Sequence, residues 1–189
     1  MKLGKTFYAA DRKAWRAWLA KNGAKEREVW LVYYRKHSGK PRIPYNDAVD
    51  EALCFGWIDS TVKRVDGEKF AQRFTPRCAN SKLSQLNKER VRVLIARKKM
   101  TEAGMKAIAH AYDKKADHRK VRLAKDVSAA LKENAAAWKH FRKFPESYKR
   151  IRIAYLESQR RHSPEAFRKS LAHFVRKTAK NKKFGFVRG

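Results

Sequence analysis

Residues able to bind a small anion gather over a short stretch in the first half of the chain. Arg73 and Arg77 carry guanidinium groups, and a serine-rich predicted helix start follows them. Guanidinium forks and helix N-termini both bind phosphate and carboxylate groups. The sequence therefore predicts an anion-binding cluster made of Asp59, Ser60, Arg73, Arg77, Ser81, Asn87 and Lys88.

The same residues also fit a structural role. The dipeptide Asp66-Gly67 predicts a tight hairpin that brings Asp59 close to opposite Arg73 on the next strand. The two side chains would then form an ion pair. Ser81 or Ser84 would cap the helix that follows. Both interpretations stay open on the sequence alone.

Catalytic residue patterns are hard to find in this chain. Its six histidines show no H-E-x-x-H spacing, and no glycine-rich phosphate loop occurs. Cys54 lies between Leu53 and Phe55, and apolar neighbours raise the pKa of a thiol and make it a poor nucleophile. We expect no metal site, no cofactor and no catalytic residue.

The positive charge of the chain is its most unusual property. Lys and Arg number 48 against 18 Asp and Glu, which leaves a formal charge of +30, mostly in the second half. A surplus of this size favours a polyanionic partner such as nucleic acid. A solvated, soluble surface is the alternative. The candidate nucleic-acid-binding residues are Arg97, Lys98, Lys99, Lys114, Lys115, Arg119, Lys120, Arg122, Arg176, Lys177, Lys180, Lys182, Lys183 and Arg188.

The sequence lacks the features of membrane and secreted proteins, which bears on the location and the partners of the protein. No segment approaches the roughly 20 apolar residues that span a bilayer, so no transmembrane segment is expected. Cys54 and Cys78 lack the spacing of a disulfide framework and are expected to be reduced. These features predict a cytoplasmic protein, and a protein partner also fits the sequence.

Helix and strand patterns divide the chain into two halves. Asp11 caps a predicted helix, residues 29–34 read as a buried central strand, and a short helix is expected after Asn46 or Asp47. Residues 57–65 and 69–75 form the predicted hairpin, and everything later reads as helix. The predicted fold class is α+β, with a small antiparallel sheet and helices followed by a C-terminal helical bundle.

The charge pattern also suggests domain limits. We expect an α+β core over residues 1–112 and a basic linker over residues 113–125. A helical part would follow over residues 126–180, packed on the core, with a basic tail at residues 181–189. Ser163 and Pro164 mark the start of the last helix.

Three motifs resemble a known family. They are the string Ala-Leu-Cys-Phe-Gly-Trp-Ile-Asp-Ser at residues 52–60, the string Gln-Arg-Phe-Thr-Pro-Arg at residues 72–77, and residues 81–91. Together with Met-Thr-Glu-Ala-Gly-Met at residues 100–105 they resemble the YdeI/OmpD-associated, or bacteriocin-protection, family. The resemblance runs from about residue 5 to the last helix, and more loosely after residue 112. The chain departs from the family pattern at Leu83, where a Trp usually stands.

Three functions remain compatible with these observations. The first is a non-catalytic accessory protein that binds nucleic acid or another polyanion, as the charge suggests. The second is a stress or antimicrobial-peptide resistance protein that acts through a protein partner, as the family label implies. The third is a small enzyme that acts on an anionic substrate through Arg73, Arg77 and Asp59.

Overall fold

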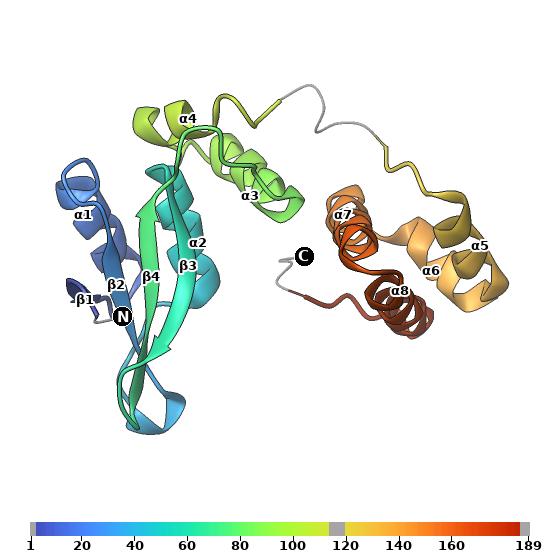
Figure 1. Ribbon diagram of the computed structural model, residues 1–189, viewed down its shortest axis with the longest axis horizontal. Coiled ribbons are helices and arrows are strands. Elements are labelled where there is room, and N and C mark those ends of the chain that lie inside the picture. Colours follow the sequence, from blue (N-terminus) through green and yellow to red (C-terminus); the bar gives the residue numbers. More distant parts are fainter. Residues whose placement is uncertain (1–2, 114–119, 186–189) are drawn as a thin grey trace. The chain divides into compact units, whose positions relative to one another are not determined.

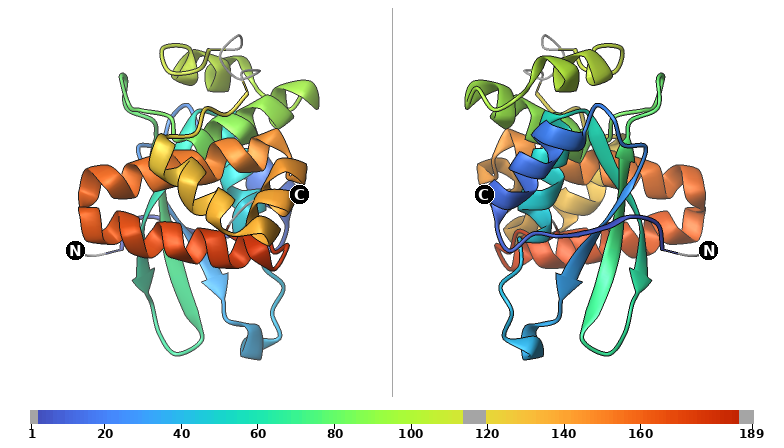
Figure 2. Two further views of the ribbon diagram at one scale, coloured as in Figure 1. Left: turned by 90° about the vertical axis from the view of Figure 1, so that its right-hand side faces the viewer. Right: turned by 90° about the vertical axis from the view of Figure 1, so that its left-hand side faces the viewer.

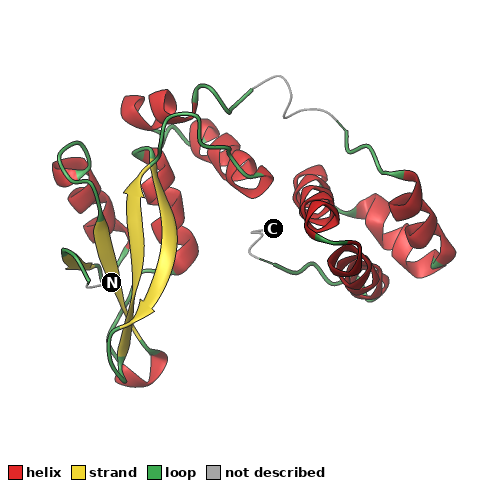
Figure 3. Cartoon of the chain, viewed as in Figure 1, coloured by secondary structure: helices red, strands yellow, loops and turns green. Residues whose placement is uncertain are grey.

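The computed structural model describes residues 3–113 and 120–185 of the chain. They form two compact units, which Figure 1 shows and which are described separately. The first unit comprises residues 3–83 with 90–113, and the second comprises residues 84–89 with 120–185. Strands occur in the first unit, whereas the second is helical (Figure 3).

A mixed four-stranded sheet organises the first unit. Its strands are β1 (Thr6–Tyr8), β2 (Val29–Tyr34), β3 (Trp57–Arg64) and β4 (Lys69–Pro76), in the order β1-β2-β4-β3. Strand β4 pairs antiparallel with both β2 and β3, while β1 runs parallel to β2. The parallel pair differs from the predicted all-antiparallel sheet. Strand β2 is internal, as predicted, and it is also largely buried.

Two helices cover one face of this sheet (Figure 2). Helix α1 (Arg12–Asn22) begins at the predicted cap Asp11, whose carboxylate accepts a hydrogen bond from the backbone of Ala14 at 2.8 Å. Helix α2 (Tyr45–Cys54) begins after Pro44, so the predicted caps Asn46 and Asp47 are wrong. A short 3-10 helix, η1 (Lys36–Ser38), follows β2. The core on this face contains Trp15, Trp18, Leu19, Leu31, Ala52, Trp57 and Phe74.

Two further helices close the first unit. Helix α3 spans Gln85–Ala96, and its first turns group with the second unit. Helix α4 (Glu102–Ile108) begins at the predicted cap Thr101, which accepts a hydrogen bond from the backbone of Gly104 at 3.1 Å. Side chains from α2, α3 and α4 form a second apolar cluster, which includes Leu53, Cys54, Leu83, Val91, Leu94 and Ile108.

The second unit contains helices α5 (Lys125–Glu133), α6 (Ala135–Lys143), α7 (Glu146–His162) and α8 (Pro164–Ala179). Asn134 separates α5 from α6 and caps α6, because its side chain accepts a hydrogen bond from the backbone of Ala137. Ser163 caps α8 with Pro164 at its start, as predicted. Helices α7 and α8 run alongside one another, as Figure 2 shows.

The second unit has an apolar core that is separate from those of the first unit. It includes Val127, Leu131, Phe141, Tyr148, Leu156, Phe167 and Phe174.

The four-stranded sheet and the later run of helices confirm the predicted α+β class in the described residues. In that part of the chain, no helix combines the length and the apolar character needed to cross a membrane.

Candidate polyanion-binding surface

The predicted pair between Asp59 and Arg73 is wrong. Asp59 lies opposite Phe74 on β4, one position along from Arg73. The carboxylate of Asp59 accepts a hydrogen bond from the Tyr45 hydroxyl at 2.7 Å. The guanidinium of Arg73 instead pairs with Glu28, with 2.6 Å between Nη2 and Oε2. Neighbouring residues of a strand point to opposite faces, which explains the separation.

Arg77 and Ser81 lie together in the loop between β4 and α3. Arg77 Nη2 donates to the carbonyl of Lys82 at 3.0 Å, and the carbonyl of Ser81 contacts His110 Nε2 at 3.0 Å. Arg77 Nε and Ser81 Oγ are both buried without a hydrogen-bond partner among the described residues. Burial lowers the pKa of the Arg77 guanidinium. The structure therefore brings Arg77 and Ser81 into one loop, and their binding of an anion stays a prediction.

The remaining members of the predicted cluster have other positions. Ser60 is exposed on β3, and its carbonyl accepts a hydrogen bond from Gln72 at 2.9 Å. Asn87 and Lys88 lie at the start of α3. The predicted cap Ser84 is confirmed, since its hydroxyl accepts a hydrogen bond from the backbone of Asn87 at 3.2 Å. The structure does not bring Asp59, Arg73 and Arg77 together around one anion.

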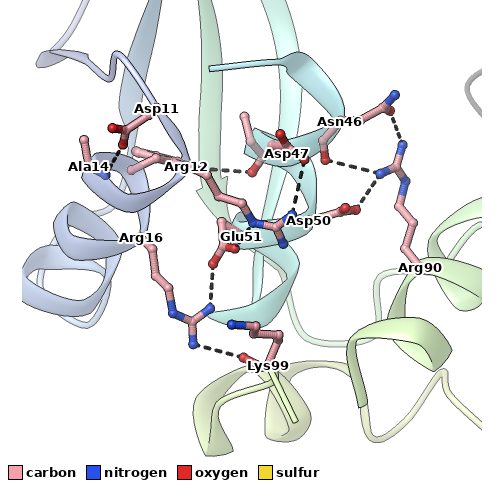
Figure 4. Close-up of polar contacts among 12 residues, drawn as sticks. Asp11, Arg12, Ala14, Arg16, Asn46, Asp47, Asp50, Glu51, Arg90 and Lys99 are labelled. Atoms are coloured by element: carbon pink, nitrogen blue, oxygen red, sulfur yellow. Dashed lines mark hydrogen bonds and ion pairs between the residues drawn. The ribbon is translucent and has the colours of Figure 1, made fainter. Parts of the chain in front are cut away.

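Acidic residues of α2 neutralise several arginines of the first unit (Figure 4). Glu51, only 1% exposed, pairs with both Arg12 and Arg16. Arg90 pairs with the buried Asp50. Breaking a buried pair leaves an uncompensated charge, so these contacts hold α1, α2 and α3 in place. These three arginines serve the fold, which reduces the number of cations free to bind a ligand.

The two cysteines differ in exposure. Cys54 is fully buried and Cys78 is exposed, and both are free thiols. Burial raises the pKa of the Cys54 thiol to about 11, even though Arg16 favours the thiolate. The structure supports the predicted core role of Cys54, since a protonated thiol is a weak nucleophile.

Carboxylates of the second unit are few. Residues 120–185 contain 19 Lys and Arg but five Asp and Glu, a formal charge of +14. Asp126 and Glu157 pair with the same arginine, so these two carboxylates neutralise one cation between them. The described ion pairs of this unit are Glu89 with Arg150, Asp126 and Glu157 with Arg160, Glu146 with Lys149, and Glu165 with Lys169.

Exposed cations without a carboxylate contact, among the described residues of the second unit, include Lys120, Arg122, Lys125, Lys132 and Arg161 and a set on α6, on α8 and on the segment 180–185. We call this set the α6–α8 basic surface. Helices α6 and α8 are joined by a 3.1 Å hydrogen bond from His140 Nδ1 to the carbonyl of Thr178. Lys143 follows His140 by three positions on α6, so it lies on the side of that helix that makes this contact. The surface comprises Lys139, Arg142, Lys143, Arg168, Arg176, Lys180, Lys182 and Lys183.

The predicted nucleic-acid-binding residues divide between the two units. Arg97, Lys98 and Lys99 are exposed in the turn after α3, in the first unit. Lys114, Lys115, Arg119 and Arg188 lie outside the described residues. Lys120 and Arg122 are exposed before α5. The members on or after α8 are Arg176, Lys177, Lys180, Lys182 and Lys183, of which Lys177 is half-buried.

Sequence reasoning missed two buried cations of α7. Lys149, 8% exposed, donates hydrogen bonds to the carbonyl of Arg142 and to Glu146, at 3.0 and 2.8 Å. It thereby satisfies the C-terminal end of α6. Arg152 is also 8% exposed, and its guanidinium lies over the rings of Tyr155 and Phe184. Burial lowers the pKa of the Arg152 guanidinium.

Comparison with protein families divides the chain in the same place. Residues 7–107 match a family described as a domain of unknown function, DUF8412. The chain belongs to this family. Residues 120–181 match a second family, described as bacteriocin-protection, YdeI or OmpD-associated, which confirms the resemblance predicted from the sequence. No curated protein and no solved structure matches the chain.

The motifs quoted for the resemblance lie in the DUF8412 region, whereas the YdeI/OmpD-associated match covers α5 to α8. The α6–α8 basic surface therefore lies within or next to the YdeI/OmpD-associated region, and the ion-pair network of Arg12, Arg16 and Arg90 lies in the DUF8412 region. Neither family description names a reaction.

Proposed function

We propose that the protein is a cytoplasmic, non-catalytic accessory protein that binds polyanions, and nucleic acid in particular. One observation supports this most directly. The α6–α8 basic surface presents exposed Lys and Arg side chains from α6, α8 and the segment 180–185 of one unit, with no carboxylate contact among the described residues. Cations of this kind release condensed counterions when they contact phosphates.

The arrangement favours contact with a backbone over recognition of bases. All eight residues that define the surface are Lys or Arg, and contacts of these residues with phosphates carry no sequence information. Arg168 and Arg176 lie eight residues apart on α8, which corresponds to about 12 Å along the helix. A surface of that length spans several phosphates of one strand. We therefore expect binding that tolerates unrelated sequences.

The first experiment measures the salt dependence of binding. Fluorescence anisotropy with two unrelated single-stranded oligonucleotides of equal length gives the affinity between 50 and 200 mM salt. We expect similar affinities for both sequences and a steep loss as salt rises, with a slope of about −0.7 per phosphate contact. Equal affinity at low and high salt would overturn the proposal.

Two matched triple variants test whether nucleic acid binds at the α6–α8 basic surface. Replacing Lys143, Lys180 and Lys183 by Gln removes three charges from the α6–α8 basic surface. Replacing the exposed Lys13, Lys25 and Lys36 by Gln removes the same charge from the first unit. The first variant should reduce the salt slope by about 2, and the second should change it little. Equal effects would show that net charge alone drives binding.

A second function rests on the description of the matched family, which names bacteriocin protection. That role would require a protein partner. Affinity purification from lysate, with and without nuclease, separates the two proposals. A specific protein retained after nuclease treatment favours the partner, whereas nucleic acid recovered alone favours polyanion binding.

A further inference from the structure

A cluster of positive groups lies where α7, α8 and the segment 180–185 meet. Arg152 on α7 contacts two rings, with its guanidinium carbon 4.7 Å from the Tyr155 centroid and 4.4 Å from that of Phe184. Arg152 Nη1 donates to the carbonyl of Phe184 over a long 3.4 Å. The cation is thus held in place largely by aromatic rings.

His173 on α8 belongs to the same cluster. Its imidazole packs edge-on against Phe184, with 4.9 Å between ring centroids. Arg176 Nη2 lies 3.2 Å from His173 Nδ1. Burial, and then the charges of Arg176, Lys177 and Arg152, lower the pKa of His173. These three cations therefore act on one imidazole.

No carboxylate contacts Arg152, Arg176 or Lys177 within the part of the chain that the structure describes. Taking a cation out of water is costly unless an opposite charge or hydrogen bonds compensate it. Arg152 is 8% exposed, and its one described hydrogen bond is the long contact with Phe184. A bound anion would supply the missing negative charge.

The helix dipole explains only part of this cluster. Arg176 and Lys177 lie in the last turn of α8, where cations are favoured. Arg152 lies in the middle of α7, and His173 lies before the last turn of α8. The dipole of α8 does not account for the burial of Arg152 or for the contact between His173 and Phe184.

We propose that Arg152, His173 and Arg176 form a binding site for a phosphate monoester. The inference rests on the proposed function. A nucleic acid bound along the α6–α8 basic surface would bring its terminal phosphate to this site. A monoester carries about −1.5 to −2 charges at neutral pH, whereas each phosphodiester carries one. A site with three nearby cations and no described carboxylate binds the more highly charged monoester more tightly than a phosphodiester.

The His173 imidazole supplies a hydrogen-bond donor to this site. In the present contact Arg176 donates to Nδ1, which places the proton of a neutral imidazole on Nε2. A phosphate dianion near His173 would stabilise the imidazolium, in which both nitrogens donate. Arg176 is exposed and can turn from Nδ1 to a phosphate oxygen.

The experiment compares one single-stranded oligonucleotide with a 5′-phosphate, with a 3′-phosphate, and with neither. We expect a terminal phosphate to tighten binding about tenfold, as a charge-assisted contact does. Inorganic phosphate should also shift the His173 imidazole signals in an NMR titration. If phosphate shifts His173 but no terminal phosphate improves binding, the site takes a small phosphorylated ligand instead, and the nucleic-acid terminus is excluded as its source.

Two variants and a control complete the test. Arg176→Gln and His173→Asn should each abolish the gain from the terminal phosphate, whereas Arg168→Gln, with the same charge change as Arg176→Gln on the same helix, should retain it. Equal affinities for all three oligonucleotides, with no response of His173 to phosphate, would overturn the site and leave general polyanion binding intact. Loss of all oligonucleotide binding, with the phosphate response of His173 preserved, would overturn only the proposed function.

Discussion

Thr101 donates two hydrogen bonds to the carbonyl of Cys54, one from its hydroxyl at 2.6 Å and one from its backbone at 3.0 Å. The start of α4 is thereby fixed to the end of α2. Gly104, one turn further, approaches the same carbonyl so closely that an added Cβ would lie 2.1 Å from it. The sequence motifs around residues 52–60 and 100–105 thus meet in one helix junction.

Gly104→Ala should destabilise the first unit. Alanine favours a helix over glycine by about 1 kcal/mol, but overpacking costs about 1–3 kcal/mol, and here the clash is with backbone. Because backbone cannot move aside easily, the cost should lie at the upper end of that range, which leaves a net loss of about 2 kcal/mol in the free energy of unfolding in urea. Gly67→Ala is the control, since nothing lies within 4 Å of the added carbon. Unchanged stability of Gly104→Ala would contradict the close contact.

Arg90→Met should have a larger effect. The Arg90 and Asp50 side chains are 8% and 12% exposed, so the variant leaves a buried carboxylate without its arginine. Breaking a buried pair costs about 3–5 kcal/mol. Arg27→Met, at an exposed position, should stay within about 0.5 kcal/mol of the parent protein. Similar unfolding midpoints for the two variants in urea would rule out a structural role for the pair.

Acid should weaken the second unit through its ion pairs. The hydrogen bond from Lys149 lowers the pKa of Glu146. A folded-state pKa below the unfolded value of about 4.3 gives stability that is complete above that value and is lost as pH falls through the folded pKa. Glu146→Gln should flatten this dependence, measured by urea unfolding between pH 3 and 6. Glu133→Gln, which removes a carboxylate with no described cation contact, is the control.

Polyanion binding should raise the pKa of His173. In the free protein, burial and the charges of Arg176, Lys177 and Arg152 lower that pKa, which favours the neutral ring. Bound phosphates would offset these charges and favour the imidazolium. NMR titrations of the imidazole signals with and without an oligonucleotide measure the change. The change should be confined to the signals that His173→Asn removes, and a parallel change in the remaining imidazole signals would indicate a nonspecific effect.

One thiol should react in the native protein. Cys78 is exposed, whereas burial raises the pKa of Cys54 to about 11. With a disulfide reagent at pH 8, we expect one equivalent of reaction, which Cys78→Ser abolishes and Cys54→Ser preserves. Rapid reaction of the Cys78→Ser variant would show that Cys54 is accessible.

Local signals in the sequence predicted much of the fold. Asp11, Thr101 and Ser163 cap their helices as expected, because a cap depends on residues three positions away. The hairpin at Asp66-Gly67 also formed. Strand β1 was missed, because three residues carry too little pattern and its pairing with β2 is parallel and distant in sequence.

The candidate site was harder to predict, because it depends on contacts between elements. The expected pair of Asp59 and Arg73 is absent because Asp59 lies opposite Phe74, so that Asp59 and Arg73 point to opposite faces of the sheet. The cluster around Arg152 joins two helices and the segment after α8, so only the spacing of His173, Arg176 and Lys177 was visible in the sequence. The burial of Arg152 and Lys149 follows from helix packing alone.

The apolar cores of the two units share no residue, since one draws on α1, α2 and the sheet and the other on α5 to α8. Heating should then produce two calorimetric peaks, with a total enthalpy larger than the van't Hoff value of either. A polyanion held by α6 and α8 would shift one peak upwards and leave the other in place. A single calorimeter scan would therefore report which half of the molecule holds the ligand.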